Sequence, residues 1–277
     1  MKKKLALLLV LCLSMGLMFG CGNTADKNPP PADNGVVADD SLTKIQDKGK
    51  LVLGLDDAFP PMGYREEGTN EIIGFDIDMA KEVASRLDVE LELQPVIWDT
   101  IIEELNGGNI DLIWNGLTIT PARVEKILFT EPYLDNAQII VVQKGSEVQS
   151  KADMAGKTIG LQGGSSAVEA VEKDEATYET LGEVIEFASN DEALMDLAAG
   201  RLDAVVVDQI VGRYYISKKA DVYEVLEEDF GAEEFGVGFR KDDVAFRDAV
   251  QKALDDMKAD GTSAKISEKW FGADIVK

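Results

Sequence analysis

The fold is indicated most clearly by residues 74–87, which read Gly74-Phe75-Asp76-Ile77-Asp78-Met79-Ala80-Lys81-Glu82-Val83-Ala84-Ser85-Arg86-Leu87. Apolar residues recur in this stretch at helical spacing and predict a helix from Phe75 to Leu87. Asp76 and Asp78 stand in its first turn, where negative charge complements the positive end of the helix dipole. We expect the apolar side to pack under a sheet, so the stretch is predicted to be structural.

The segments around this helix alternate between strands and helices. Lys50–Leu55 and Asp111–Trp114 are short apolar runs that predict buried strands, and Glu90–Gln94 alternates as a strand. Thr100–Leu105 is helical and ends at the stop signal Asn106-Gly107-Gly108. Strands separated by helices predict a parallel α/β sheet.

The same cycle begins again after Gly145. Strands are predicted at Lys157–Gln162, Val184–Ala188 and Ala204–Asp208, with a helix at Glu192–Ala199. The small residues after Gln162 are expected to open another helix. We therefore predict an α/β protein of two lobes, each a mostly parallel sheet flanked by helices.

The first residues have the layout of a secretory signal peptide, predicted over 1–20. Met1-Lys2-Lys3-Lys4 is basic, and the apolar run from Leu5 to Leu17 is shorter than the roughly 20 residues that a transmembrane helix needs. An uncleaved anchor helix is the alternative. Leu17-Met18-Phe19-Gly20-Cys21 resembles a bacterial lipobox, which implies a lipid such as palmitate on Cys21. An ordinary cut site before an incidental cysteine stays open.

Polar and proline-rich residues follow over 21–41 and predict a disordered tether. The net charge of −24 argues against nucleic acid as a partner, because nucleic-acid binding needs basic surface. The chain contains no histidine, which excludes a Ser-His-Asp triad and a histidine-ligated zinc site. We expect no metal, no cofactor and no catalytic residue.

Residues 74–87 also resemble the signature of the family 3 bacterial solute-binding proteins, which are the polar amino-acid receptors of ABC importers. The resemblance continues through Leu53–Asp56, Phe59–Met62, Asp111–Arg123, Phe129–Tyr133, Gly156–Gly160, Gly200–Ala204 and Lys269–Gly272. It implies a two-lobed periplasmic-binding-protein-like fold of type II, in an extracytoplasmic, lipid-anchored monomer that delivers a free L-amino acid to an ABC transporter permease.

This resemblance also implies where the chain divides. Lobe 1 is expected over 42–139 and 237–277, and lobe 2 over 140–236. Ala137–Lys144 and Glu234–Arg240 look like the two crossing strands of the hinge.

The chemistry of a free amino acid defines what its site needs. Its carboxylate calls for a forked cation and its ammonium for a carboxylate, placed beyond the carboxyl ends of sheet strands. The resemblance implies that Arg123 holds the α-carboxylate, together with the hydroxyl and N–H of Thr118. It assigns the α-ammonium to the Gly116 carbonyl and to Asp208.

Further residues are implied for the rest of the site. The loop with Gly163, Ser165 and Ser166 is expected to offer backbone N–H groups to the carboxylate. The resemblance places Phe59 and Trp98 along the ligand's side chain and Asp56 at its far end. A carboxylate there favours a basic or neutral polar amino acid.

Each of these residues has a plainer interpretation. In this alternative, Arg123 is a surface residue near a turn and Asp208 is a helix cap. Phe59 and Trp98 are then ordinary core residues. The same two-lobed fold resembles that of periplasmic dehydratases, so a cleft enzyme is an alternative, as is a detached amino-acid sensor. We favour a binding protein without catalysis, because an acid facing Arg123 suits an α-amino acid.

Overall fold

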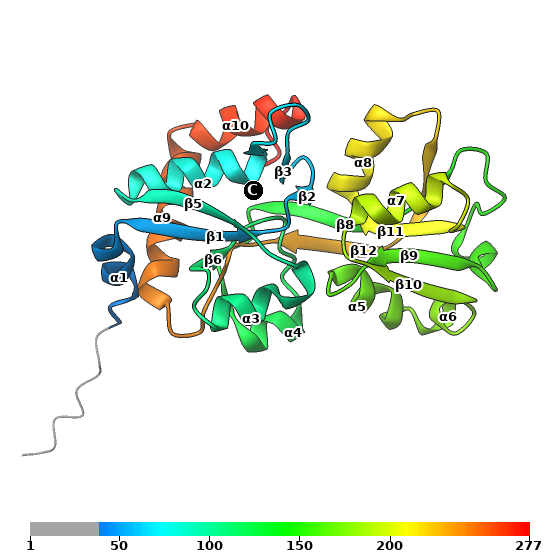
Figure 1. The fold of residues 1–277 in the computed structure, drawn as a ribbon, viewed down its shortest axis with the longest axis horizontal. Helices are drawn as coiled ribbons and strands as arrows, with labels where there is room; N and C mark the ends of the chain where they lie inside the picture. Colours follow the sequence, from blue (N-terminus) through cyan, green and yellow to red (C-terminus); the bar gives the residue numbers. More distant parts are fainter. Residues whose placement is uncertain (1–38) are drawn as a thin grey trace, which may run out of the picture. The chain divides into compact units, whose positions relative to one another are not determined.

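The structure is a computed structural model, and it describes residues 39–277 (Figure 1). The first half of this region contains α1 (Ser41–Lys48), β1 (Lys50–Leu55), β2 (Ala58–Phe59), β3 (Gly63–Arg65), β4 (Ile72–Ile73), α2 (Phe75–Arg86), β5 (Glu90–Pro95), the short 3-10 helix η1 (Trp98–Thr100), α3 (Ile101–Asn106), β6 (Leu112–Ile113), α4 (Pro121–Lys126) and β7 (Leu128–Phe129).

The second half contains β8 (Leu134–Gln143), the 3-10 helix η2 (Lys151–Met154), β9 (Thr158–Gln162), α5 (Ser166–Lys173), α6 (Glu175–Tyr178), β10 (Glu183–Phe187), α7 (Asn190–Ala198), β11 (Ala204–Asp208), α8 (Gln209–Lys218), β12 (Tyr223–Phe235), β13 (Gly238–Phe239), α9 (Val244–Ala259) and α10 (Thr262–Phe271). The predicted strands and helices are confirmed, with ends that differ by a few residues, except that the strand predicted over 234–240 is divided.

Within residues 39–277 the chain builds two five-stranded sheets. The first has the order β5-β1-β6-β13-β7 and the second the order β10-β9-β11-β8-β12. Figure 1 shows α2 and α10 on one face of the first sheet and α3 and α4 on the other; α7 and α8 cover one face of the second sheet, and α5 and α6 the other. We call the units around these sheets the first and second lobes.

Both sheets are mixed, where the sequence predicted mostly parallel ones. β1 pairs in parallel with β5 and β6, and β9 pairs in parallel with β10 and β11. The pairings that involve β8, β12 and β13 are antiparallel. These strands enter or leave a sheet directly, without the helical crossover that a parallel pairing requires.

The chain passes between the sheets at residues 129–134 and again at 235–238. Glu234–Arg240 was predicted as one strand, but β12 ends at Phe235 and β13 begins at Gly238. The backbone turns to new partners in between, since the Gly236 N–H donates to the Leu117 carbonyl at 3.0 Å. The predicted lobe boundaries at 139/140 and 236/237 stay predictions.

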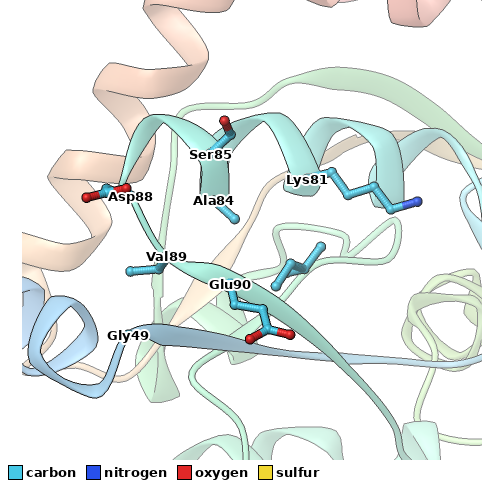
Figure 2. Close-up of a pocket in the computed structure, with 8 residues that line it drawn as sticks. Gly49, Lys81, Ala84, Ser85, Asp88, Val89 and Glu90 are labelled. Atoms are coloured by element: carbon cyan, nitrogen blue, oxygen red, sulfur yellow. The ribbon is translucent and has the colours of Figure 1, made fainter.

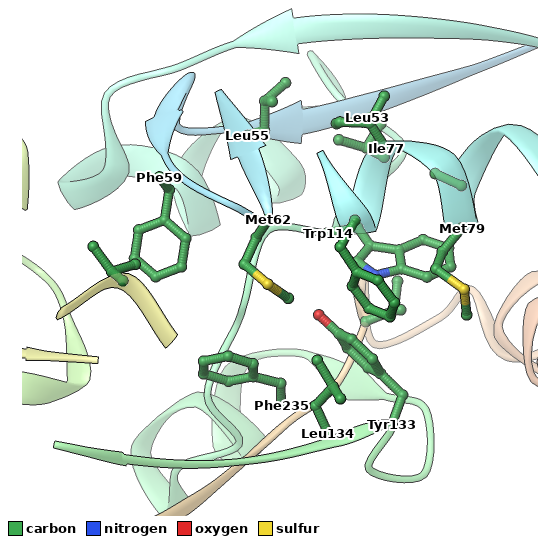
Figure 3. Packing of buried hydrophobic residues seen from close by; sticks show 14 of the residues in the cluster. Leu53, Leu55, Phe59, Met62, Ile77, Met79, Trp114, Tyr133, Leu134 and Phe235 are labelled. Carbon is green, nitrogen blue, oxygen red and sulfur yellow. The ribbon is translucent and has the colours of Figure 1, made fainter. Parts of the chain in front are cut away.

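The helix at residues 75–86 packs against the first sheet as predicted. Ile77 and Met79 are fully buried, and Figure 3 shows Ile77 beside Leu53 of β1. Burying an aliphatic side chain of this size contributes roughly 1.5–3 kcal/mol. The apolar side of α2 therefore holds one face of the first lobe.

The predicted tether overlaps the described residues at its end, Ser41. The tether was predicted to extend to this residue, but α1 begins there. Ser41 is buried, and its Oγ accepts a hydrogen bond from the Phe246 N–H at 3.0 Å, so it belongs to the folded body. The predicted signal peptide, Cys21 and the tether up to residue 38 lie outside the described residues. From residue 39 onward, each helix is too short or too polar to cross a membrane.

Candidate functional site

The predicted site residues stand at the carboxyl ends of strands from both lobes, where open α/β sheets bind ligands. Several hydrogen bonds join the two lobes there. Gln162 Nε2 donates to Asp56 Oδ2 at 2.8 Å, the Arg123 Nη2 donates to the Gly164 carbonyl at 3.0 Å, and Ser166 Oγ donates to Thr118 Oγ1 at 3.0 Å. Residues distant in sequence therefore form one buried polar cluster.

Arg123 is positioned by the start of α4, as its sequence context predicted. Thr120 caps this helix, with Oγ1 accepting from the Arg123 N–H at 3.3 Å, and Pro121 occupies the first turn. The guanidinium is buried and donates to two carbonyls, Thr118 at 2.9 Å and Gly164. Within residues 39–277 it forms no ion pair. The interpretation of Arg123 as a surface residue is therefore wrong.

Burial lowers the pKa of Arg123, while the charges of Glu169, Asp208 and Glu233 act to raise it. An arginine stays protonated in proteins. The cluster therefore holds a buried positive charge with several acids around it.

Gly116 is held by the signature helix. Its N–H donates to Asp76 Oδ2 at 2.8 Å, and Tyr133 donates its hydroxyl to the same oxygen at 2.9 Å. Burial raises the pKa of Asp76 to about 7. A side chain on Gly116 would meet the Phe59 ring at 2.7 Å, and its φ of 60° lies in the left-handed region. Asp76 thus fixes the loop that carries a predicted ligand contact, which the helix-dipole argument did not foresee.

Asp208 ends β11 and receives two amide donors from β8. Its Oδ1 accepts from Asn136 Nδ2 at 2.6 Å and from Gln138 Nε2 at 2.9 Å. Burial, and next the charge of Glu233, raise the pKa of Asp208 to about 7. The buried oxygens of the two amides have no hydrogen-bond partner among residues 39–277. Neither amide was predicted from the sequence; the signal that could have found them is two amides two residues apart near the start of β8.

Glu233 is a further acid that sequence analysis missed. It lies opposite Asn136 in the β8–β12 register. Its Oε2 accepts from Thr118 Oγ1, Ser166 Oγ and Asn136 Nδ2 at 3.1 Å each, and from Gln138 Nε2 at 3.0 Å. Glu233 belongs to an acidic stretch that resembles an ordinary solvated face, so the sequence carried no signal for this role.

Asp56 lies at the end of β1 and is buried. Its Oδ1 accepts from the Ala58 N–H at 2.9 Å, and its own N–H donates to Asn115 Oδ1 at 3.2 Å. Burial raises the pKa of Asp56. Asn115 therefore holds the backbone of Asp56 in place.

Phe59 and Trp98 face each other with parallel rings. The planes differ by 5° and the ring centroids are 6.4 Å apart. A flat group between two rings needs about 7 Å, twice a van der Waals separation of roughly 3.5 Å. A small opening of this pair therefore admits a guanidinium, an imidazole or an amide.

The loop after β9 contributes less than predicted. The Gly163 N–H donates to the Phe187 carbonyl at 2.9 Å, inside the second sheet. Ser165 donates both its N–H and its hydroxyl to the Gln162 carbonyl, at 3.2 and 2.7 Å. These donors are already engaged, so their assignment to an anion needs correction. Ser166, at the start of α5, does reach the cluster.

Another hollow, of about 620 Å³, lies between the end of α2 and the start of β5, with Lys81, Ser85 and Glu90 in its wall (Figure 2). It adjoins the amino end of β5, opposite the strand ends that bind ligands in open α/β folds. We assign it no function. Among residues 39–277, no group of three or more acid or cysteine side chains is arranged so that it could hold a metal ion.

Comparison with known proteins agrees with this architecture. The L-cystine-binding protein TcyJ of Escherichia coli K12 is 32% identical over 238 residues, which cover 85% of this chain and 88% of that protein. The arginine-binding extracellular protein ArtP of Bacillus subtilis is 31% identical over 273 residues, with 98% of each chain covered.

A solved structure of similar fold is the substrate-binding protein of an ABC uptake transporter from Streptococcus pneumoniae with bound histidine. Its TM-score is 0.83 at 33% identity, covering 87% of this chain and 99% of that one. A family model, that of the bacterial extracellular solute-binding proteins, family 3, matches residues 51–273. The chain belongs to the bacterial extracellular solute-binding proteins of family 3.

Proposed function

We propose that this protein is the extracytoplasmic substrate-binding component of an amino-acid ABC importer and captures a basic or neutral polar L-amino acid between its lobes. The observation that carries the proposal is the buried guanidinium of Arg123, which donates to two carbonyls, forms no ion pair with any of residues 39–277, and faces the buried acid Asp208. A free amino acid supplies the opposite charge to each.

We assign the α-carboxylate to the guanidinium of Arg123 and to the hydroxyls of Thr118 and Ser166. The α-ammonium is assigned to Asp208 and to the Gly116 carbonyl. The side-chain oxygens of Asn136 and Gln138, which have no partner among residues 39–277, support this end of the assignment because they add acceptors beside Asp208.

The ligand's side chain is assigned to the space between Phe59 and Trp98, with Asp56 at its end. The parallel rings favour a flat group, and the buried acid favours a donor or a cation. The three relatives described above are named for binding cystine, arginine and histidine, which fit a basic or neutral polar class.

The remaining parts of the proposal rest on the sequence. We propose that Cys21 carries a lipid anchor, palmitate included, that the protein acts as a monomer, and that its partner is an ABC permease. Residues 137–144 and 234–240 would act as the hinge, and closure around the ligand would present the shape that the permease reads.

Binding is tested with purified protein from which co-purified ligand has been removed. A screen of the twenty amino acids by thermal shift identifies ligands, which raise the melting temperature of the folded state. Calorimetry then compares Arg123→Ala with Lys126→Ala, which removes an exposed cation from the same helix. We expect a loss of at least about 30-fold in affinity for Arg123→Ala alone, because breaking a buried charge pair costs about 2–5 kcal/mol.

One observation favours an enzyme of the same fold as a second candidate. A buried Asp208 with a pKa of about 7 suits a general acid in a cleft. Incubating the protein with the amino acids that bind it, and analysing the solution for new products, separates the two candidates. Unchanged ligand supports the binding protein, while product formation that Asp208→Asn abolishes supports the enzyme.

A further inference from the structure

One side chain outside the assigned roles lies against the assigned carboxylate site. Glu233 Oε2 accepts from Thr118 Oγ1 and Ser166 Oγ, at 3.1 Å each. We propose that Glu233 is a tethered competitor, whose carboxylate must leave these two hydroxyls before the ligand's α-carboxylate can bind them. This inference rests on the proposed function, because it deepens the assignment of the same site.

The hydroxyl protons explain why two carboxylates compete. A hydroxyl has one proton to donate. Thr118 Oγ1 accepts from Ser166 Oγ at 3.0 Å, so its own proton points to Glu233. Ser166 accepts from Gln138 Nε2 at 3.1 Å and divides its single proton between Thr118 and Glu233. Neither hydroxyl has a second proton for the ligand.

Charge adds to this competition. A ligand carboxylate held by Arg123 and the two hydroxyls would lie beside the carboxylate of Glu233, and like charges at such range repel. The charge of Glu233 also acts on Asp208, since it contributes to the raised pKa of that carboxyl. Binding therefore favours a conformation in which Glu233 has moved away.

A solvent-accessible hollow lies beside Glu233 and could receive its side chain. β12 is the edge strand of the second sheet, and Glu233 is partly exposed. It adjoins a hollow of about 180 Å³ that is also lined by Thr118, Ser166 and the exposed residue Lys173. A rotated carboxylate would meet water there, with both the ammonium of Lys173 and the carboxylate of Glu169 in the same wall. Asn136 and Gln138 would keep Asp208 as a hydrogen-bond acceptor.

A competitor of this kind weakens the binding of every ligand that carries a carboxylate. The apparent affinity falls by the fraction of molecules in which Glu233 has left the hydroxyls. An amine without a carboxylate does not need those hydroxyls, so Glu233 does not compete with it. The two ligand classes therefore respond in different ways to loss of this side chain.

The test compares wild type with Glu233→Ala and Glu233→Gln by calorimetry against the twenty L-amino acids, with agmatine and histamine as carboxylate-free probes. Glu227→Ala, an exposed acid on the same strand, is the control for lost charge. We expect amino-acid affinity to rise about tenfold in Glu233→Ala, the value of one charged hydrogen bond, and less in Glu233→Gln, whose amide oxygen still accepts. The affinity of the amines should not rise.

Equal or weaker amino-acid binding by both Glu233 variants, with melting temperatures like that of wild type, would overturn the inference and leave the proposed function intact. If neither wild type nor Glu233→Ala binds any of the twenty, the proposed function fails together with the inference. Binding by Glu233→Ala alone would support both.

Discussion

Lowering the pH is expected to weaken amino-acid binding, because Asp208 gains a proton. Burial and the neighbouring Glu233 raise its pKa to about 7, and a neutral carboxyl no longer attracts the ligand's ammonium. The ionised fraction falls by about a factor of ten for each pH unit below the pKa. Relative to pH 8, the affinity should therefore drop about tenfold at pH 6 and about 100-fold at pH 5.

Calorimetry at pH 8, 7, 6 and 5 measures this loss directly. Near pH 6, repeating the titration in buffers of different ionisation enthalpy reports the proton that binding releases. Asp208→Asn is the matched variant, since it keeps the shape, and we expect weak binding without this pH dependence. Asp56 also has a raised pKa, so Asp56→Asn shows what it adds. An affinity that changes less than about threefold between pH 8 and pH 5 would refute the reasoning.

Three further predictions concern the fold and the anchor. Gly116→Ala should destabilise the protein more than Gly49→Ala, because both lose a left-handed glycine, worth about 1 kcal/mol, but only the former meets an aromatic ring; chemical denaturation measures the difference. Ile77→Ala should lower the free energy of unfolding by about 2–5 kcal/mol, against about 0.5 kcal/mol or less for the exposed Lys81→Ala. Cys21→Ala should move the protein from the membrane fraction to the soluble fraction, as immunoblotting of both fractions would show.

Hydrophobic patterning predicted the elements well because burial repeats locally along a strand or helix. β1, α2 and β11 lie where the apolar runs indicated. The division of the predicted strand 234–240 was not visible, because it depends on the partners that the backbone meets at Leu117 and Tyr133. The mixed character of the sheets has the same origin, since strand direction is set by connections outside any one strand.

The site was predictable where one residue type fits one chemistry. Arg123 stands out as a cation after a helix cap, and Asp208 as an acid at a strand end. Glu233 was hidden in an acidic stretch, and only its register opposite Asn136 brings it to the cluster. The N–H of Gly163 was expected to bind the ligand's carboxylate. The sequence does not show that Phe187, at the end of the neighbouring strand β10, already accepts from this N–H.

The roles of Asp208 and Glu233 are coupled, which makes the pH profile a second test of the competitor. The charge of Glu233 is one cause of the raised Asp208 pKa, so Glu233→Gln should lower that pKa and move the loss of affinity to lower pH. At pH 8 the variant gains only from weaker competition for the two hydroxyls, because a neutral amide oxygen accepts less strongly than a carboxylate. At pH 6 it gains also from a more fully ionised Asp208, so its advantage over wild type should be larger there. An advantage that stays constant with pH would mean that burial alone sets the Asp208 pKa.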